Sequence, residues 1–343
     1  MNKTIEIKVT DSIVELKNVF VGNHGIIYDN NGDMINREII FSGKTNSNFG
    51  VNNHIKSFMS YKAAKYDKSL LDDENDIKEA IFSDAYQIVD NNNYIHQFHF
   101  FDFYVWGHLW DNLGLLEDFE NLNIDFKLAI SQITSHVSDL FKHFKLVGYE
   151  KNKVVSFPSN KGPYFFPTLF VNKDWNRGAY IRNKKWIEQK YIYNNPEIEF
   201  DKLKDERYKL FLSRSKYKDG AKYRQILNED IIWDILKDKG YIRLYGDEGL
   251  TDHIKYFMNA EKIITAHGSF VRNMAFCLRD PEIWEFFPSY RLDMKYFPWF
   301  HTSNIFKIVA KEINLNKYFF IVTESDKDQN IIIDPEFIKI IGE

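Results

Sequence analysis

The feature that most constrains the fold is an alternation of short apolar runs with helix-like segments between residues 208 and 287. Buried strands are predicted in the runs YKLFL, YIRLYG, KIITA and EIWEFF. The segments between these runs carry apolar residues at helical spacing, and we expect Asn228 to cap the first helix and Gly240 to end it. Units of this length predict a parallel sheet with helices on both faces, so the expected fold class is α/β.

The first half of the chain begins with strand patterns and then starts an alternation of its own. A strand is predicted in VELKNVFVG, and Asn31-Gly32 has the signature of a hairpin turn. Further along, FKLAIS and LFKHFKLVGYEKNKVVSF predict a strand, a helix that ends at Gly148, and another strand. The polar segment 190–207 is predicted to be a linker, which gives two domains, residues 1–193 and 194–343.

Composition and charge exclude several classes of protein. The 343 residues carry a net charge of −4, so the general basic surface of a nucleic-acid-binding protein is missing. A single cysteine, Cys277, excludes a disulfide framework and a thiolate metal cluster. The sequence has no apolar run long enough to span a membrane and no signal-peptide pattern at its start, so we expect a cytoplasmic protein. Oligomeric state leaves no signal in the sequence.

The stretch IITAHGSFVRNMAF indicates an anion site where a strand passes into a helix. Ligands of open α/β sheets bind at the carboxyl ends of strands, where backbone N–H groups and a helix N-terminus attract anions. Gly268 would let the backbone approach a phosphate, and His267 and Arg272 would add donors. The alternative is a turn that needs a glycine, beside a histidine held by local hydrogen bonds.

Two charged residues near the ends of predicted strands extend this hypothesis. Arg214 follows the strand YKLFL directly, where a guanidinium group can grip a phosphate in a bidentate manner. The basic residues from Lys216 to Lys222 fit a solvated loop at least as well. Glu285 interrupts the apolar run IWEFFP and therefore needs a partner. That partner is either a ligand hydroxyl, such as a ribose, or an arginine at position 279 or 291.

The aromatic segment HQFHFFDFYVWGHLWDNLGLL contains several histidines and two candidate carboxylates, Asp102 and Asp111. Its spacing does not match a His-Glu-x-x-His metal site, so we expect no metal there. The better functional interpretation is that Asp111 or Asp102 serves as a general base, and the alternative is a helix with buried histidines. The chain has no Gly-x-Ser-x-Gly, no P-loop and no Gly-x-Gly-x-x-Gly, which argues against serine hydrolases, P-loop kinases and dinucleotide dehydrogenases.

Several segments, taken in order, resemble glycosyltransferase family 61 from about Val14 to Pro335. They include WGHLWDNLGLLEDF, FKLVGYEKNKVVSF, LFLSRSKYKDGAKYRQILNED, MNAEKIITAHGSFVRNMAFC and IWEFFP. The residues that match the family's motifs are Ser213, Arg214, Asn228, Glu229, His267, Gly268, Asn273 and Glu285. The chain departs from the family at Ser269-Phe270, where the usual pair is Ala-Gly. It also has a shorter spacing between His108 and Asp111, which leaves HFFDF, with Asp102, as a rival alignment.

The resemblance implies a GT-B architecture, in which two Rossmann-like domains face each other across a cleft. Residues 1–193 would form the acceptor-side domain and residues 194–343 the nucleotide-sugar-binding domain. The implied reaction is an inverting single displacement from a nucleotide diphosphate sugar, such as UDP-xylose or UDP-GlcNAc, to a hydroxyl of a glycan or glycoprotein, with no essential metal. Asp111, or else Asp102, would be the base. The donor would be held by Arg214, His267, Gly268, Ser269, Asn273 and Glu285.

Two rival functions remain open at this point. The same scaffold could serve a nucleotide-sugar epimerase or hydrolase, which would turn over the donor without an acceptor. A non-catalytic protein that binds nucleotides or glycans is the second, and the substitution at Phe270 motivates it. The expected setting is cytoplasmic glycan assembly in a bacterium or a virus.

Overall fold

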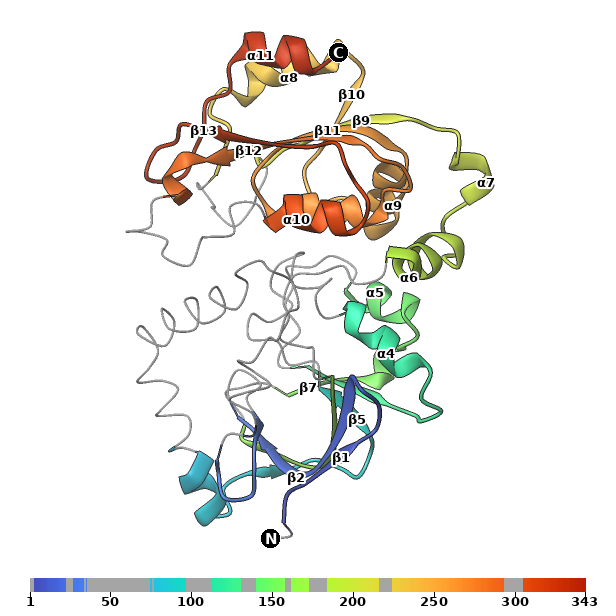
Figure 1. The fold of residues 1–343 in the computed structure, drawn as a ribbon, viewed down its shortest axis with the longest axis vertical. Coiled ribbons are helices and arrows are strands. Elements are labelled where there is room, and N and C mark those ends of the chain that lie inside the picture. Colours follow the sequence, from blue (N-terminus) through green and yellow to red (C-terminus); the bar gives the residue numbers. More distant parts are fainter. Residues whose placement is uncertain are drawn as a thin grey trace. The chain divides into compact units, whose positions relative to one another are not determined.

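The computed structural model describes residues 3–22, 27–33, 35, 75, 77–96, 113–130, 140–157, 162–172, 184–215, 224–292 and 305–343. The chain divides into two compact units, Met1–Tyr180 and Ile181–Glu343. Each unit has its own sheet (Figure 1) and is described by itself. Within the described ranges, no helix combines the length and the apolar character needed to cross a membrane.

The N-terminal unit is built on a mixed sheet. Its strands are β1 (Ile5–Lys8), β2 (Ile13–Val21), β3 (Ile27–Tyr28), β4 (Gln87–Ile88), β5 (Tyr94–His96), β6 (Lys127–Ile130), β7 (Val154–Ser156) and β8 (Tyr164–Asn172). The main order is β1-β2-β8-β5-β6-β7, with antiparallel pairing among β1, β2 and β8 and parallel pairing from β8 to β7. Its short helices are η3 (Gly114–Leu116), α4 (Glu117–Glu120), α5 (Leu140–Leu146) and η4 (Lys151–Lys153).

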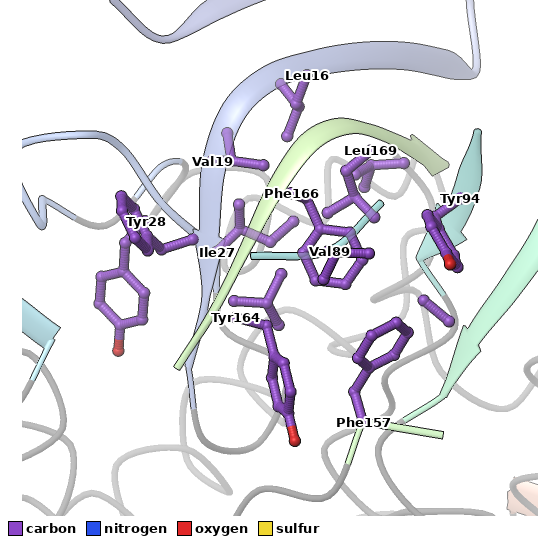
Figure 2. Packing of buried hydrophobic residues seen from close by; sticks show 14 of the residues in the cluster. Leu16, Val19, Ile27, Tyr28, Val89, Tyr94, Phe157, Tyr164, Phe166 and Leu169 are labelled. Atoms are coloured by element: carbon purple, nitrogen blue, oxygen red, sulfur yellow. The ribbon is translucent and has the colours of Figure 1, made fainter. Parts of the chain in front are cut away.

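Aromatic side chains make up much of the core of this unit, as Figure 2 shows. The rings of Tyr94, Phe157 and Phe166 pack edge to face, with centroids 5.1 to 5.6 Å apart. Pairs of this kind contribute about 0.5–1.5 kcal/mol beyond the area that they bury. These aromatic residues are therefore part of the packed core.

The C-terminal unit holds a parallel sheet in the order β10-β9-β11-β12-β13. Helices α8 and α11 cover one face, and α9 and α10 cover the other (Figure 1). The strands are β9 (Tyr208–Leu212), β10 (Tyr241–Leu244), β11 (Ala260–Ala266), β12 (Glu282–Pro288) and β13 (Tyr318–Thr323). The helices are α6 (Lys184–Glu188), η6 (Gln189–Tyr193), α7 (Phe200–Leu203), α8 (Glu229–Lys237), α9 (Leu250–Met258), η7 (Ser269–Phe276), η8 (Ser289–Leu292), α10 (Ile305–Glu312) and α11 (Pro335–Ile341).

The C-terminal unit confirms the α/β class and the strands that the apolar runs predicted. Two local predictions turn out differently. Asn228 lies at the start of α8 but makes no capping bond there; its amide instead exchanges hydrogen bonds with the backbone of Ile333, at 2.7 and 3.1 Å. The start of the predicted linker is helical, and Tyr191 is fully buried with its ring 5.6 Å from that of Phe276. That packing makes the segment part of the core of the C-terminal unit.

Candidate functional site

The strand order of the C-terminal sheet singles out the ends of β9 and β11. The strand that follows β9 in the chain, β10, lies at one edge of the sheet, whereas β11, β12 and β13 follow one another on the other side of β9. The connections that leave β9 and β11 therefore run to opposite sides of the sheet. Open α/β sheets bind their ligands outside the carboxyl ends of the strands at such a reversal. A ligand site is thus expected at the loops that begin at Ser213 and His267.

Arg214 and Gly268 meet at these two strand ends. Leu212 of β9 pairs with Thr265 of β11, so the loops that follow start at nearly the same level. A Cβ atom added to Gly268 would collide with Nη1 of Arg214, and Cζ of Arg214 would lie 3.5 Å away. Since φ of Gly268 is 178°, its backbone is extended and any residue could adopt it. Glycine leaves room here for the guanidinium group to lie against the bare backbone.

His267 and Glu285 form a buried pair beside this loop. The Nδ1 atom of His267 lies 2.6 Å from Oε1 of Glu285, and the two side chains are 4% and 0% exposed. Tyr318 donates its hydroxyl to Oε2 of Glu285 at 3.0 Å. Burial raises the pKa of Tyr318 well above its ordinary value, and the Glu285 carboxylate adds to that shift, so this hydroxyl stays protonated. A histidine and a tyrosine are therefore two partners that the described residues give to Glu285.

Aromatic rings surround the imidazole of His267. The ring centroid of Phe287 is 4.5 Å from that of His267, and the centroid of Phe306 is 5.3 Å away. The guanidinium carbon of Arg272 lies 5.6 Å from the Phe306 ring centre, in cation–π contact. Such surroundings exclude water and strengthen the bond between His267 and Glu285.

Helix η7 contains the three remaining residues of interest, Ser269, Phe270 and Asn273. Ser269 begins the helix and is half-buried. Asn273 is fully buried, and the part of the chain that the structure describes offers no hydrogen-bond partner to either of its amide atoms. The Phe270 ring packs 5.0 Å from the ring of His253 and 5.7 Å from that of Phe257. Both are residues of α9, so this helix accommodates the ring that replaces the family's glycine.

Two residues that the sequence analysis did not identify, Arg243 and Tyr318, bind residues of the site or next to it. Arg243 forms an ion pair with Glu229 and donates to Ser215 at 3.2 Å, next to Arg214. A signal for Arg243 was present, because it is a charge inside the apolar run YIRLYG, as Glu285 is in IWEFFP. Tyr318 has no comparable signal, since a tyrosine at the start of a strand is an ordinary core residue.

The turn after β10 is organised by Glu248. Its carboxylate accepts hydrogen bonds from the backbone N–H groups of Tyr245 and Gly246, at 2.7 and 2.8 Å, and lies 3.3 Å from Nε2 of His253. Burial alone would raise the pKa of Glu248, but these hydrogen bonds outweigh it and lower the pKa to about 2. A Cβ atom on Gly246 would lie 3.7 Å from the ring of Phe270, so this turn packs beside η7.

Replacing Glu248 with glutamine is expected to destabilise the protein in a pH-dependent way. Since the pKa of Glu248 is about 2 instead of about 4.5, its charge stabilises the folded state above pH 4.5. That contribution is lost as the pH falls from 4.5 towards 2. We expect Glu248→Gln to cost about 1–2 kcal/mol at pH 7, after allowance for solvent screening. Thermal unfolding at pH 7 and at pH 3 measures this; an equal difference from the native protein at both values contradicts it.

The predicted base residues, Asp102 and Asp111, lie outside the described residues, as do His108 and the basic residues from Lys216 to Lys222. The structure therefore brings together Arg214, His267, Gly268 and Glu285 and leaves the base as a prediction. Within the described ranges, no cluster of three or more His, Cys, Asp or Glu side chains could hold a metal ion.

A comparison with known protein families gives a match. A family profile described as Glycosyltransferase 61 matches residues 106–283, which is just over half of the chain. The match begins before the predicted base Asp111 and includes the loops that carry Arg214 and Gly268. No curated protein matches the chain. Because the profile covers more than half of the chain, the chain belongs to glycosyltransferase family 61.

Proposed function

We propose that the protein transfers a sugar, with inversion, from a nucleotide diphosphate donor to a hydroxyl of a glycan or glycoprotein. A UDP-sugar, such as UDP-xylose or UDP-GlcNAc, is the proposed donor. The observation that carries the proposal is the contact of the Arg214 guanidinium with the bare backbone of Gly268 at the ends of β9 and β11. A guanidinium group beside the start of a helix suits a diphosphate, which requires several donors in a small space.

The proposed reaction is a single displacement. The acceptor oxygen bonds to the anomeric carbon, the bond from that carbon to the diphosphate breaks, and its electron pair leaves with the diphosphate. The acceptor proton passes to a carboxylate, for which we propose Asp111 and, as the second candidate, Asp102. Negative charge grows on the departing diphosphate, where Arg214 and the Gly268 loop would stabilise it. The proposal requires no resident metal, because these cationic and N–H groups take that role.

His267 and Glu285 have linked roles in this proposal. Glu285 has no exposed surface, so it acts through His267 and not by direct contact with a ribose. Its carboxylate lies 2.6 Å from Nδ1 and fixes the orientation of the imidazole, whose Nε2 atom we propose to face the diphosphate. Asn273 and Ser269 would support the same loop.

The N-terminal unit is proposed to supply the acceptor side and the base. Under the GT-B arrangement, which we propose from the family resemblance, the two units face each other across a cleft that holds both substrates. A donor bound to the C-terminal sheet would then present its anomeric carbon to a carboxylate from the N-terminal unit.

Replacing Gly268 with alanine is expected to remove most transfer activity while the protein stays folded. The new methyl group would collide with the Arg214 guanidinium and push it from the loop, although the backbone itself can keep its extended conformation. We expect the KM for the donor to rise about tenfold or more, because a charge-assisted contact is displaced. Gly114→Ala, at the start of η3, is the control for the turnover assay, because an added Cβ atom there meets no atom of the described residues within 4 Å and φ is not positive. Unchanged kinetics in Gly268→Ala would contradict the contact.

Replacing Asp111 with asparagine tests the base. The change keeps the size of the side chain but removes its ability to accept a proton, so we expect kcat to fall about a hundredfold or more. The donor KM should stay within about twofold of the native value, because the base does not hold the diphosphate. Transfer of radiolabelled sugar to acceptor measures both constants, and Asp102→Asn is the parallel variant. Near-normal turnover in Asp111→Asn would show that the base is elsewhere.

A further inference from the structure

The turn that carries Arg214 is attached on both sides to a buried ion pair. Ser213, before Arg214, donates its hydroxyl to Oε1 of Glu229. Ser215, after Arg214, accepts a hydrogen bond from Nη2 of Arg243 at 3.2 Å. The two serine hydroxyls lie 3.0 Å apart, and the backbone N–H of Ser215 donates to Oγ of Ser213 at 3.2 Å. These contacts fix the backbone immediately before and after Arg214.

The ion pair itself joins two further elements of the unit. Arg243, on β10, pairs through Nη2 with Oε1 of Glu229, the first residue of α8. The two side chains are 12% and 6% exposed. The guanidinium carbon of Arg243 also lies 5.2 Å from the ring centre of Tyr245 and 5.5 Å from that of Trp233. Arg243 therefore connects β10, α8 and the turn after β9 through one rigid, planar group.

A buried ion pair of this kind points to a role in specifying geometry. Moving both charges out of water is costly, and apolar residues of similar size often give equal or greater stability. The pair gives the turn a defined position because an apolar side chain could not bond to the two serines. It also keeps the Glu229 carboxylate occupied. Without Arg243, the buried Glu229 carboxylate would lose this cation and could draw Arg214, on the attached turn, away from Gly268.

We propose that Arg243 and Glu229 are positioning residues, which hold the Ser213–Ser215 turn so that Arg214 lies over Gly268 and faces the donor's diphosphate. This inference rests on the proposed function, because it concerns how the diphosphate contact is held in place. Neither residue needs to touch the donor. The pair acts through Arg214, so its effect should depend on the side chain at that position.

A double-mutant cycle tests this dependence. The readout is the affinity for inorganic diphosphate, measured by calorimetry, because this probe carries the anion without a base or a sugar. Ser215→Ala removes the hydrogen bond from Arg243 to the turn and the contact between the two serine hydroxyls. Because Ser215 is exposed, we expect this variant to fold normally. Arg243→Lys is the second variant; it keeps the charge and loses the planar fork. Arg207→Lys is the matched control, since Arg207 is exposed and directly precedes β9.

We expect Ser215→Ala and Arg243→Lys each to weaken diphosphate binding about five- to tenfold in the native background. The same changes should have less than about a twofold effect in Arg214→Lys. A lysine keeps the charge, so diphosphate binding stays measurable, but its flexible side chain does not depend on the position of the turn. Equal losses in both backgrounds, or no loss in the native one, would overturn the positioning role. If Arg214→Lys itself binds diphosphate as the native protein does, or if the native protein does not bind it, the proposed donor site fails together with this inference.

Discussion

Replacing Arg214 with alanine is expected to lower kcat/KM for sugar transfer by about 10²–10³-fold, which corresponds to about 3 kcal/mol in the barrier. The reason is the position of the guanidinium group, which lies against the bare backbone of Gly268 at the reversal in strand order. A hydrogen-bond donor that points to the oxygen where charge develops stabilises the transition state more than it stabilises the bound nucleotide sugar. The loss should therefore appear in kcat as well as in KM.

The protein should stay folded in this variant, because Arg214 is half-buried and follows the last residue of β9 by two positions. We expect the melting temperature to remain within about 2 °C of the native value. Arg207→Ala is the matched control, with the same change of charge at an exposed position before β9, and it should transfer sugar normally. Activity of Arg214→Ala within about threefold of the native protein would contradict the proposed diphosphate contact.

The largest expected effect on stability comes from Glu285→Ala. This change removes a fully buried carboxylate and leaves Nδ1 of His267 and the hydroxyl of Tyr318 without the group that binds both. Breaking a buried pair by removing one partner costs about 3–5 kcal/mol. For a unit of this size we expect the melting temperature of the C-terminal unit to fall by roughly 10 °C.

Two further variants separate the contributions to this loss. Glu285→Gln keeps the size of the side chain and one acceptor oxygen, so it should cost roughly half as much as Glu285→Ala. Tyr318→Phe removes only the hydroxyl and should cost about 1 kcal/mol. Scanning calorimetry of the four proteins measures these differences. A melting temperature of Glu285→Ala within about 2 °C of the native value would show that the buried pair does not stabilise the unit.

The architecture of the C-terminal unit could be predicted from sequence to a large extent. Its strands are short apolar runs with defined ends, and such runs are typical of parallel strands that are covered by helices on both faces. Asn228 shows the limit of local rules: its side chain has the chemistry of a helix cap, yet it bonds with Ile333, more than a hundred positions along the chain. A contact between residues so far apart in the chain cannot be predicted from the sequence around either of them.

The site was predictable in its parts, but its assembly was not. The sequence indicated His267 and Gly268 after one strand and Arg214 after another, and the strand order then brings them to one place. The partners of Glu285 could not be chosen from sequence, because burial shows only that a partner is needed. The fold supplies His267 and Tyr318, and neither was among the partners that the sequence suggested.

The central claim is that a nucleotide diphosphate sugar binds where Arg214 and His267 meet the Gly268 loop. The most direct measurement is thermal unfolding of the native protein, Arg214→Ala and His267→Ala with a panel of UDP-, GDP-, dTDP- and CMP-sugars. A ligand at about a hundred times its dissociation constant stabilises the folded state by roughly 2.7 kcal/mol, which a thermal shift detects. The account predicts a shift with a UDP-sugar that is lost in both variants, and no shift with a CMP-sugar, which has a single phosphate. No shift with any nucleotide sugar, or a shift that survives in Arg214→Ala, would contradict it.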